Sequence, residues 1–287
     1  MKKIIVILLL IGSFSVTYGQ TDKVNTLIEE GIKLYDSGNH KSAIAKYKKA
    51  LDIDKDNIYA LSELAMTYST DGDCEKAISI CKETINKYPK SQALTVIYST
   101  YGNCLDKTGK SKEAIKIYKE GIKKYPDYQM LHFNLGITLY SQKKYEEASL
   151  TLQKAVLINP KHASSHFYLG IVLDNLEQRI PEILAMSRFL ILEPKGKRAG
   201  QVLPFLDKRM KTGVQQTGEN SITISFDEKM IDDINKGKAK ENDFNIVDML
   251  LTLTNGLTVT KENKNNRHWL MSFQVPFLVS SFTIFRI

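Results

Sequence analysis

The chain has 287 residues, of which 43% are hydrophobic and 25% charged, and its formal net charge is +8. This balance is typical of a globular protein and excludes a disordered chain, a collagen and a polytopic membrane protein. Only six of the 40 basic residues are arginine. Because bidentate phosphate recognition favours arginine, the positive charge does not indicate a nucleic-acid partner.

The first residues have the layout of a secretory signal peptide. Two lysines precede an apolar run at Ile4–Ile11 that is too short to span a bilayer, and small and polar residues follow it. The best cleavage point follows Gly19, and Ser13 with Ser15 offers a second candidate. We therefore expect residues 1–19 to be a signal peptide, and the mature chain to be exported as a soluble periplasmic or secreted protein.

Three cysteines allow one disulfide at most. Cys74 and Cys81 lie seven residues apart, which on one helix is about 10 Å of rise and beyond the reach of a disulfide. Cys81 with Cys104 is the pair whose geometry suits a bridge. The alternative is that all three are small apolar side chains in helix interfaces.

Residues recur through the middle of the chain at a nearly constant interval, which indicates a repeat architecture. Four alanines recur at intervals of 34, 37 and 34 in the numbering: Ala43, Ala77, Ala114 and Ala148. Small residues stand twelve positions before them and continue the series once more: Gly31, Ala65, Gly102, Gly136 and Gly170. Packing residues stand four positions after them: Tyr47, Cys81, Tyr118 and Leu152. Twelve positions after them come Lys55 and then prolines: Pro89, Pro126, Pro160 and, continuing the series, Pro194.

Two antiparallel helices per repeat account for this pattern. A small residue in the first helix lets the second helix approach closely, the alanine fits against that gap, and the proline ends the second helix. Gly38, Gly72 and Gly109 fall between the two helices, where a tight turn requires a positive φ.

These residues resemble the tetratricopeptide repeat, a 34-residue helix-turn-helix with small residues at two fixed points and a terminal proline. The resemblance implies an all-α fold: a helix-turn-helix solenoid of about five repeats within residues 20–196, followed by a less regular, mainly helical region at 197–287. The five repeats are 24–57, 58–91, 95–128, 129–162 and 163–196. Three departures stand out: Lys55 replaces a proline, Gln92–Leu94 are inserted, and Glu182 replaces the packing alanine of the fifth repeat.

The first helices of such a solenoid line a concave groove, and the resemblance implies a non-enzymatic scaffold that binds a partner peptide or helix there. We expect this groove to be apolar and aromatic at both ends and polar in the middle. Its anchors are aromatic, Met and Ile side chains with one amide: Tyr35, Tyr59, Met66, Asn103, Met130, Phe133, Ile137, Tyr140 and Phe167. The alternative is that these side chains fill gaps between neighbouring repeats. Some relatives hold a terminal carboxylate with Lys and Asn, but Ser99 stands where that clamp needs a lysine, so the clamp is disfavoured.

No catalytic or cofactor-binding motif is present, and we predict neither an enzyme nor a cofactor. His162 and His166 share a helical face, and His132 occupies the position of His166 in the preceding repeat, so a Zn²⁺ or Cu²⁺ site is an alternative. The repeat usually places a large aromatic residue at the positions of His132 and His166. We therefore predict no metal.

The repeat pattern ends after Gly196. Lys195–Lys211 carries a net charge of +5 and apolar residues at helical spacing, which predicts a basic helix that caps the last repeat. Contact with anionic lipid headgroups or an acidic partner is the alternative. Residues 212–220 read as a linker, Ser221–Phe226 alternate as a strand does, and Phe244–Thr254 have helical spacing.

Trp269–Phe285 has no charged residue over 17 positions. A membrane span, a buried segment and a truncated end are the three interpretations, and membrane contact is not favoured because Gln274 and Pro276 interrupt the run. An alternative function follows: residues 212–287 form an envelope-associated module with membrane association or an unrecognised activity, and the repeats dock it.

Overall fold

The computed structural model describes residues 20–218, 221–225, 252, 270–274 and 283–284. The predicted signal peptide lies outside these residues and stays a prediction, as does the predicted helix at 244–254 apart from Thr252. The chain divides into two units, residues 1–159 (unit 1) and residues 160–287 (unit 2), and each is described by itself.

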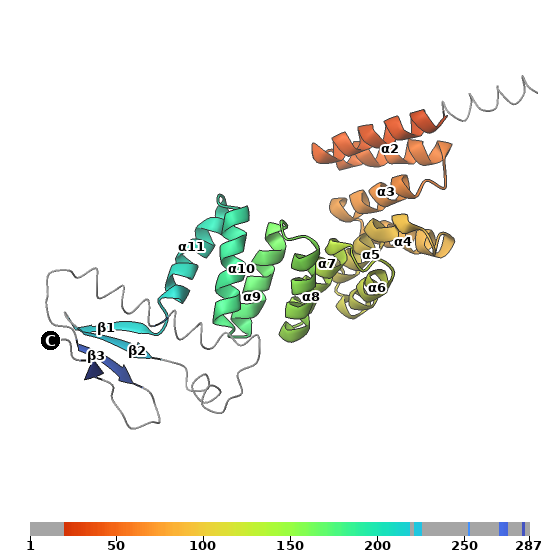
Figure 1. The fold of residues 1–287 in the computed structure, drawn as a ribbon. Helices are drawn as coiled ribbons and strands as arrows, with labels where there is room; N and C mark the ends of the chain where they lie inside the picture. Colours follow the sequence, from red (N-terminus) through yellow and green to blue (C-terminus); the bar gives the residue numbers. More distant parts are fainter. Residues whose placement is uncertain (1–19, 219–220, 226–251, 253–269, 275–282, 285–287) are drawn as a thin grey trace, which may run out of the picture. The chain divides into compact units, whose positions relative to one another are not determined.

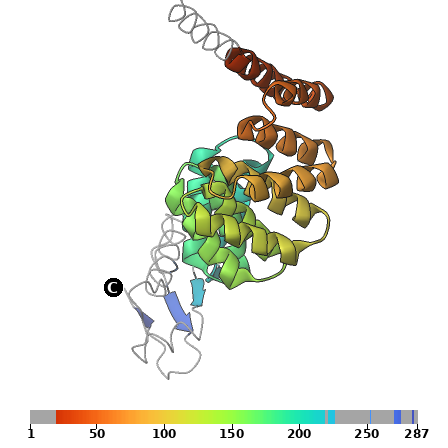
Figure 2. The same ribbon diagram turned by 90° about the vertical axis from the view of Figure 1, so that its right-hand side faces the viewer.

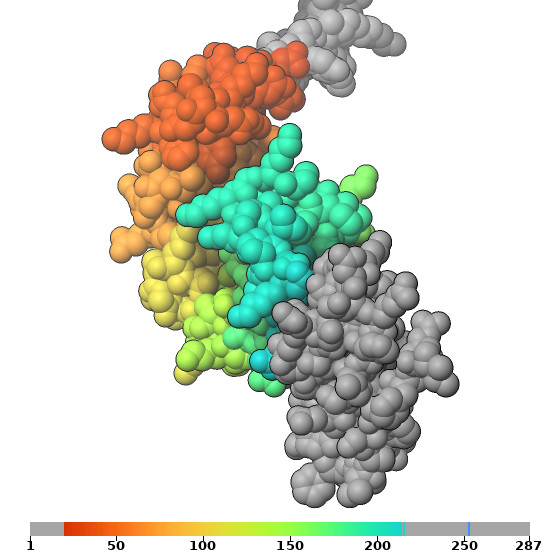
Figure 3. Space-filling model, turned by 90° about the vertical axis from the view of Figure 1, so that its left-hand side faces the viewer, coloured from red at the N-terminus to blue at the C-terminus, as the bar shows by residue number. Residues whose placement is uncertain are grey.

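Unit 1 is a succession of helices that follow one another in chain order (Figure 1 and Figure 2). Its elements are a helix at residues 20–36, α2 (His40–Ile53), α3 (Ile58–Asp71), α4 (Cys74–Lys87), the 3₁₀ helix η1 (Gln92–Leu94), α5 (Thr95–Lys107), α6 (Ser111–Lys124), α7 (Gln129–Ser141) and α8 (Tyr145–Ile158). These are four helix pairs, and the inserted residues predicted between the second and third repeats form η1. In the space-filling view the pairs of unit 1 lie against one another in chain order (Figure 3).

Unit 2 continues with three helices and then changes to strands. Its elements are α9 (Ala163–Asn175), α10 (Arg179–Leu192), α11 (Lys197–Met210), β1 (Val214–Gly218), β2 (Ser221–Ser225), β3 (Leu270–Gln274) and β4 (Thr283–Ile284). The predicted all-α repeat architecture is confirmed, and so are the helix after the fifth repeat and the strand near Ser221.

The described residues beyond α11 add a small sheet, in contrast to the mainly helical C-terminal region that we expected. Its order is β1-β2-β3-β4: β1 pairs antiparallel with β2, β2 parallel with β3, and β3 antiparallel with β4. The parallel pair joins Ser221–Ser225 to Leu270–Gln274, two segments far apart in the chain, and local periodicity does not reveal such a connection.

In each helix pair, the turn between the two helices contains one residue with a positive φ at the same repeat position. Gly38, Gly72 and Gly109 adopt φ of 79°, 94° and 78°, as predicted. The equivalent positions of the fourth and fifth repeats are Lys143 and Glu177, both with φ of 57°. The turn therefore imposes a positive φ even where no glycine is present.

The second helix of a pair packs over the small residue of the first. A Cβ added to Gly31 would lie 2.4 Å from a ring carbon of Tyr47, and one added to Gly102 would lie 2.2 Å from a ring carbon of Tyr118. The residue that fills the gap is thus the one four positions after the alanine, which corrects our assignment of that place to the alanine itself. In the second repeat Ala65 has a Cβ, and the equivalent second-helix residue is the small Cys81.

Candidate protein-interaction surface

The predicted groove residues lie on the first helix of each pair. Tyr35 is on the helix at residues 20–36, Tyr59 and Met66 are on α3, and Asn103 is on α5. The remaining four of unit 1 are on α7: Met130, Phe133, Ile137 and Tyr140. Phe167 is on α9 in unit 2, and the other eight residues all belong to unit 1.

Their exposure separates surface side chains from packing side chains. Tyr59 is 55% exposed, whereas Phe133 is 9% exposed. The half-buried members are Tyr35, Met66, Asn103, Met130, Ile137 and Tyr140. We call Tyr35, Tyr59, Met66, Asn103, Met130, Ile137 and Tyr140 the first-helix surface of unit 1.

Two aromatics of the first-helix surface also make contacts with their own or the next repeat. The Tyr35 hydroxyl shares a hydrogen bond with Thr70 Oγ1 (3.1 Å), and its ring lies 5.3 Å from the His40 ring. The Tyr140 ring lies 5.9 Å from that of Tyr145. These rings are oriented by the fold and keep part of their area in solvent.

Other polar side chains of α5, α6 and α7 form a hydrogen-bonded network between these neighbouring helices. Asn134 Nδ2 donates to Ser99 Oγ (2.8 Å), and Thr138 Oγ1 donates to Asp106 Oδ2 (2.9 Å). Ser111 Oγ donates to the other Asp106 oxygen (2.6 Å). These hydrogen bonds join α5 to α6 and α7.

Asn103 differs from its polar neighbours. The hydroxyl of the buried Tyr118 donates to Asn103 Oδ1 (2.7 Å), which fixes the amide so that its two Nδ2 hydrogens remain as donors. Within the described residues Nδ2 has no hydrogen-bond partner. This geometry leaves the Asn103 amide as a hydrogen-bond donor on the first-helix surface.

Three family models match this region of the chain. One, described as TPR repeat, matches residues 31–72, and two, described as tetratricopeptide repeat, match residues 59–91 and 105–166. The chain is a tetratricopeptide-repeat protein. Tetratricopeptide repeats build surfaces that bind other proteins, so it is a protein-protein interaction scaffold, and its fold is in general a non-enzymatic one.

Solved structures share the fold of this tetratricopeptide-repeat protein. PilF of Pseudomonas aeruginosa is 17% identical and matches with a TM-score of 0.56, covering 86% of this chain and 95% of that one. A thermophilic TPR protein of Thermus thermophilus is 16% identical, with a TM-score of 0.54 and coverage of 65% and 98%. PilW, described as a type IV pilus biogenesis factor, is 15% identical, with a TM-score of 0.54 and coverage of 65% and 90%. No curated protein matches the chain.

Phe167 has a packing role in the fifth tetratricopeptide repeat. Its ring lies 5.0 Å from Phe189 and 5.5 Å from Tyr168. The Arg198 guanidinium lies 5.1 Å from the Phe167 ring centre and 5.2 Å from that of Phe189. Phe167 is half-buried and packs against the core of unit 2, which favours the gap-filling alternative at this position.

His132 and His166 stand at the repeat position where a large aromatic residue is usual, and each contacts a backbone carbonyl. His132 Nε2 lies 2.8 Å from the Pro126 carbonyl oxygen, and His166 Nε2 lies 3.0 Å from that of Pro160. Burial lowers the pKa of both imidazoles below the ordinary value of 6.5. No group of three His, Cys, Asp or Glu side chains suited to a metal ion exists in the part of the chain that the structure describes.

The three cysteines are buried and free. The Cys81–Cys104 bridge that the sequence left possible is not formed in this structure, and the three buried side chains correspond to small apolar residues in helix interfaces. Burial raises the pKa of the Cys104 thiol to about 12 and raises that of Cys81 as well, so both are protonated at neutral pH.

Three of the six basic residues in Lys195–Lys211 form ion pairs with acidic residues of the same chain. Arg198 binds Glu193, Arg209 binds Glu182, and Lys211 lies 2.9 Å from Asp207. The other three, Lys195, Lys197 and Lys208, have no ion pair among the described residues. The local charge of this segment is thus lower than its composition indicates, which weakens the interpretation of the segment as a contact for anionic lipid.

Among the described helices, none has the length and apolar character to cross a bilayer.

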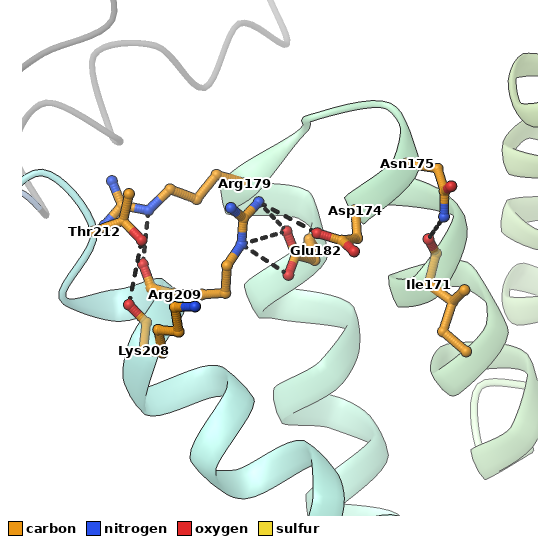
Figure 4. Close-up of polar contacts among 8 residues, drawn as sticks. All are labelled: Ile171, Asp174, Asn175, Arg179, Glu182, Lys208, Arg209 and Thr212. Atoms are coloured by element: carbon orange, nitrogen blue, oxygen red, sulfur yellow. Dashed lines mark hydrogen bonds and ion pairs between the residues drawn. The ribbon is translucent and has the colours of Figure 1, made fainter.

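The sequence marked one further residue without revealing its role. Glu182 replaces the packing alanine, and the structure shows it fully buried in an ion pair with Arg209 (Figure 4). Arg179 and Thr252 belong to the same network. The Glu in an alanine position was the signal, but the partners in this network lie far along the chain and follow no periodic pattern.

Proposed function

We propose that the protein binds a segment of a partner protein, extended or helical, along the first helices of its repeats. The first-helix surface of unit 1 supplies the main anchors. The observation that carries the proposal is Tyr59, an aromatic side chain left 55% exposed on α3, the first helix of the second repeat. Solvent-exposed aromatic area is costly to leave uncovered and is typical of binding hot spots.

The neighbours of Tyr59 fit such a role. Met66 is seven residues further along α3 and half-buried, so it adds a flexible apolar contact on the same face. Asn103 Nδ2 is a donor suited to a backbone carbonyl of the bound segment. The partner would contribute apolar side chains and a main chain with free carbonyl groups.

The test is a pair of double variants that remove the same kind of exposed apolar area from different helix faces. Tyr59→Ala with Met66→Ala removes the anchors, whereas Leu150→Ala with Leu157→Ala removes side chains of α8 that are 69% and 74% exposed. Proteins crosslinked to the parent in its own cells are identified, and their recovery with each variant is quantified. We expect the first variant to lose partner recovery by about tenfold or more, as hot-spot truncations do. Loss with the α8 variant and retention with the Tyr59 variant would refute the proposal.

A further inference from the structure

The fifth repeat has a buried charge where the other repeats have a methyl group. Ala43, Ala77, Ala114 and Ala148 are fully buried, and so is Glu182 at the equivalent position. A buried carboxylate is tolerated only when a partner satisfies it. An alanine accepts any neighbouring helix, whereas a glutamate accepts one that brings a cation.

That cation is Arg209, near the end of α11. Its Nε donates to both Glu182 oxygens, at 3.1 and 3.0 Å, and its Nη2 donates to Oε2 (Figure 4). Nη2 also lies 3.8 Å from Asp174 Oδ1. The forked contact fixes both the position and the orientation of the last turn of α11 against α10.

Arg179, the first residue of α10, binds the end of α11 from the other side. Its Nε donates to the Arg209 carbonyl (2.9 Å), and its Nη2 donates to the Met210 carbonyl (3.0 Å). The last carbonyls of a helix have no i+4 partner within the helix, and Arg179 supplies side-chain donors to two of them. The Arg209 carbonyl also accepts from the Thr212 backbone N–H (3.3 Å). The third nitrogen, Nη1, donates to Thr252 Oγ1 (2.9 Å).

The repeat period shows that α11 lacks the second helix that would pair with it in a sixth repeat. α11 begins at Lys197, one repeat period after the start of α9 at Ala163, so it stands where the first helix of a sixth repeat belongs. A second helix would begin one period after Arg179, near Gly213, but the chain enters β1 at Val214 instead. The adjacent chain therefore supplies no second helix for α11.

We propose that the end of the repeat array, formed by the start of α10 and the end of α11, is an intramolecular docking site for the chain segment that carries Thr252, and that Arg179 recognises this segment. Thr252 is 3% exposed, although it lies outside the repeats. Glu182 and Arg209 hold the two α11 carbonyls in place, and those carbonyls orient the Arg179 fork. In this orientation Arg179 Nη1 donates to Thr252 Oγ1. Glu182 thus marks the fifth repeat as the one that receives the C-terminal region.

The experiment is hydrogen exchange of the full chain, read on the peptide that contains Thr252. Thr252→Val removes the acceptor and leaves α10 and α11 unchanged, while Thr252→Ser keeps a hydroxyl. Arg179→Ala removes the whole fork, and Lys208→Ala removes an exposed cation of α11 as a control. A hydrogen bond to a charged group changes an equilibrium by about tenfold or more. We therefore expect about tenfold faster exchange around Thr252 in Thr252→Val and in Arg179→Ala, with the parent rate in Thr252→Ser and Lys208→Ala.

Two results would overturn the proposal. One is parent-like exchange around Thr252 in the Thr252→Val variant. The other is protection that increases with protein concentration, because the occupant would then be a second copy. If Arg179→Ala unfolds α10 and α11, as circular dichroism would report, Thr252→Val alone decides.

Discussion

In the first four repeats the second helix presents a buried alanine, whereas in the fifth it presents the buried carboxylate of Glu182. An apolar methyl group stabilises by close packing and does not discriminate among neighbours. A buried ion pair adds little net stability, but removing one partner is costly, so it selects one neighbour. The comparison indicates that the first four repeats are built for stacking and the fifth for one specific contact.

The largest test of this comparison is Arg209→Leu. The variant leaves the Glu182 carboxylate buried without its guanidinium, and the free energy of unfolding of unit 2 should fall by about 3–5 kcal/mol. Urea denaturation followed by circular dichroism measures this fall. Lys208→Leu removes an exposed cation of the same helix and should change the free energy by less than about 0.5 kcal/mol.

The second half of this test places an alanine at position 182, where the first four repeats have one. Glu182→Ala combined with Arg209→Leu replaces the ion pair by apolar groups, and most of the lost stability should return. If the double variant is less stable than Arg209→Leu alone, the pair is not the specific contact that the comparison requires.

A smaller effect concerns the small residue of the first helix. Alanine is a better helix former than glycine by about 1 kcal/mol, so the outcome depends on what the new Cβ meets. At Gly102 it meets the rigid Tyr118 ring at 2.2 Å, and we expect Gly102→Ala to lower the free energy of unfolding by about 2 kcal/mol. At Gly170 it meets the flexible Met186 side chain at 2.7 Å and beyond, so Gly170→Ala should be nearly neutral. Thermal unfolding of both variants checks this, and equal shifts would contradict it.

The repeated part of the molecule was predictable because its constraints are periodic. The positive φ at Gly38, the absence of a side chain at Gly102 and the helix pairs all follow from the regular repeat spacing. Exposure within the first-helix surface was not predictable from position alone. Tyr59 and Phe133 both stand on the first helix of a repeat, but Tyr59 is 55% exposed and Phe133 is 9% exposed.

The unrepeated part was predictable only where a signal is local. The alternation at Ser221–Phe226 is visible in six residues, and the structure has a strand at Ser221–Ser225. Its parallel pairing with Leu270–Gln274 and the bond between Arg179 and Thr252 depend on residues far apart in the chain. Such contacts depend on tertiary folding, which a single sequence does not encode in any spacing.

The smallest expected effect is the pH dependence of stability that His132 and His166 cause. These two histidines occupy equivalent positions in the fourth and fifth repeats, whereas the buried charge of Glu182 occurs only in the fifth of the five repeats. Burial holds the pKa of His132 and of His166 below 6.5, although Asp127 opposes this at His132, and Lys154 and Arg188 add to it at the two sites respectively. Between the lowered pKa and 6.5 the unfolded chain binds protons that the folded chain does not. The free energy of unfolding should therefore fall as the pH drops below 6.5 and recover above it.

His132→Phe with His166→Phe places an aromatic ring, the usual residue of this repeat, at both positions. The double variant should lose most of this pH dependence, as measured by the thermal midpoint at a series of pH values from 7 to 5. His162, whose pKa burial also lowers, stays in place and leaves a residual slope. A variant with the parent's full pH dependence would show that other groups cause it. Glu182 would not be that group, because burial raises its pKa above the ordinary value of 4.5, and its titration stabilises the folded chain as the pH falls, which is the opposite slope.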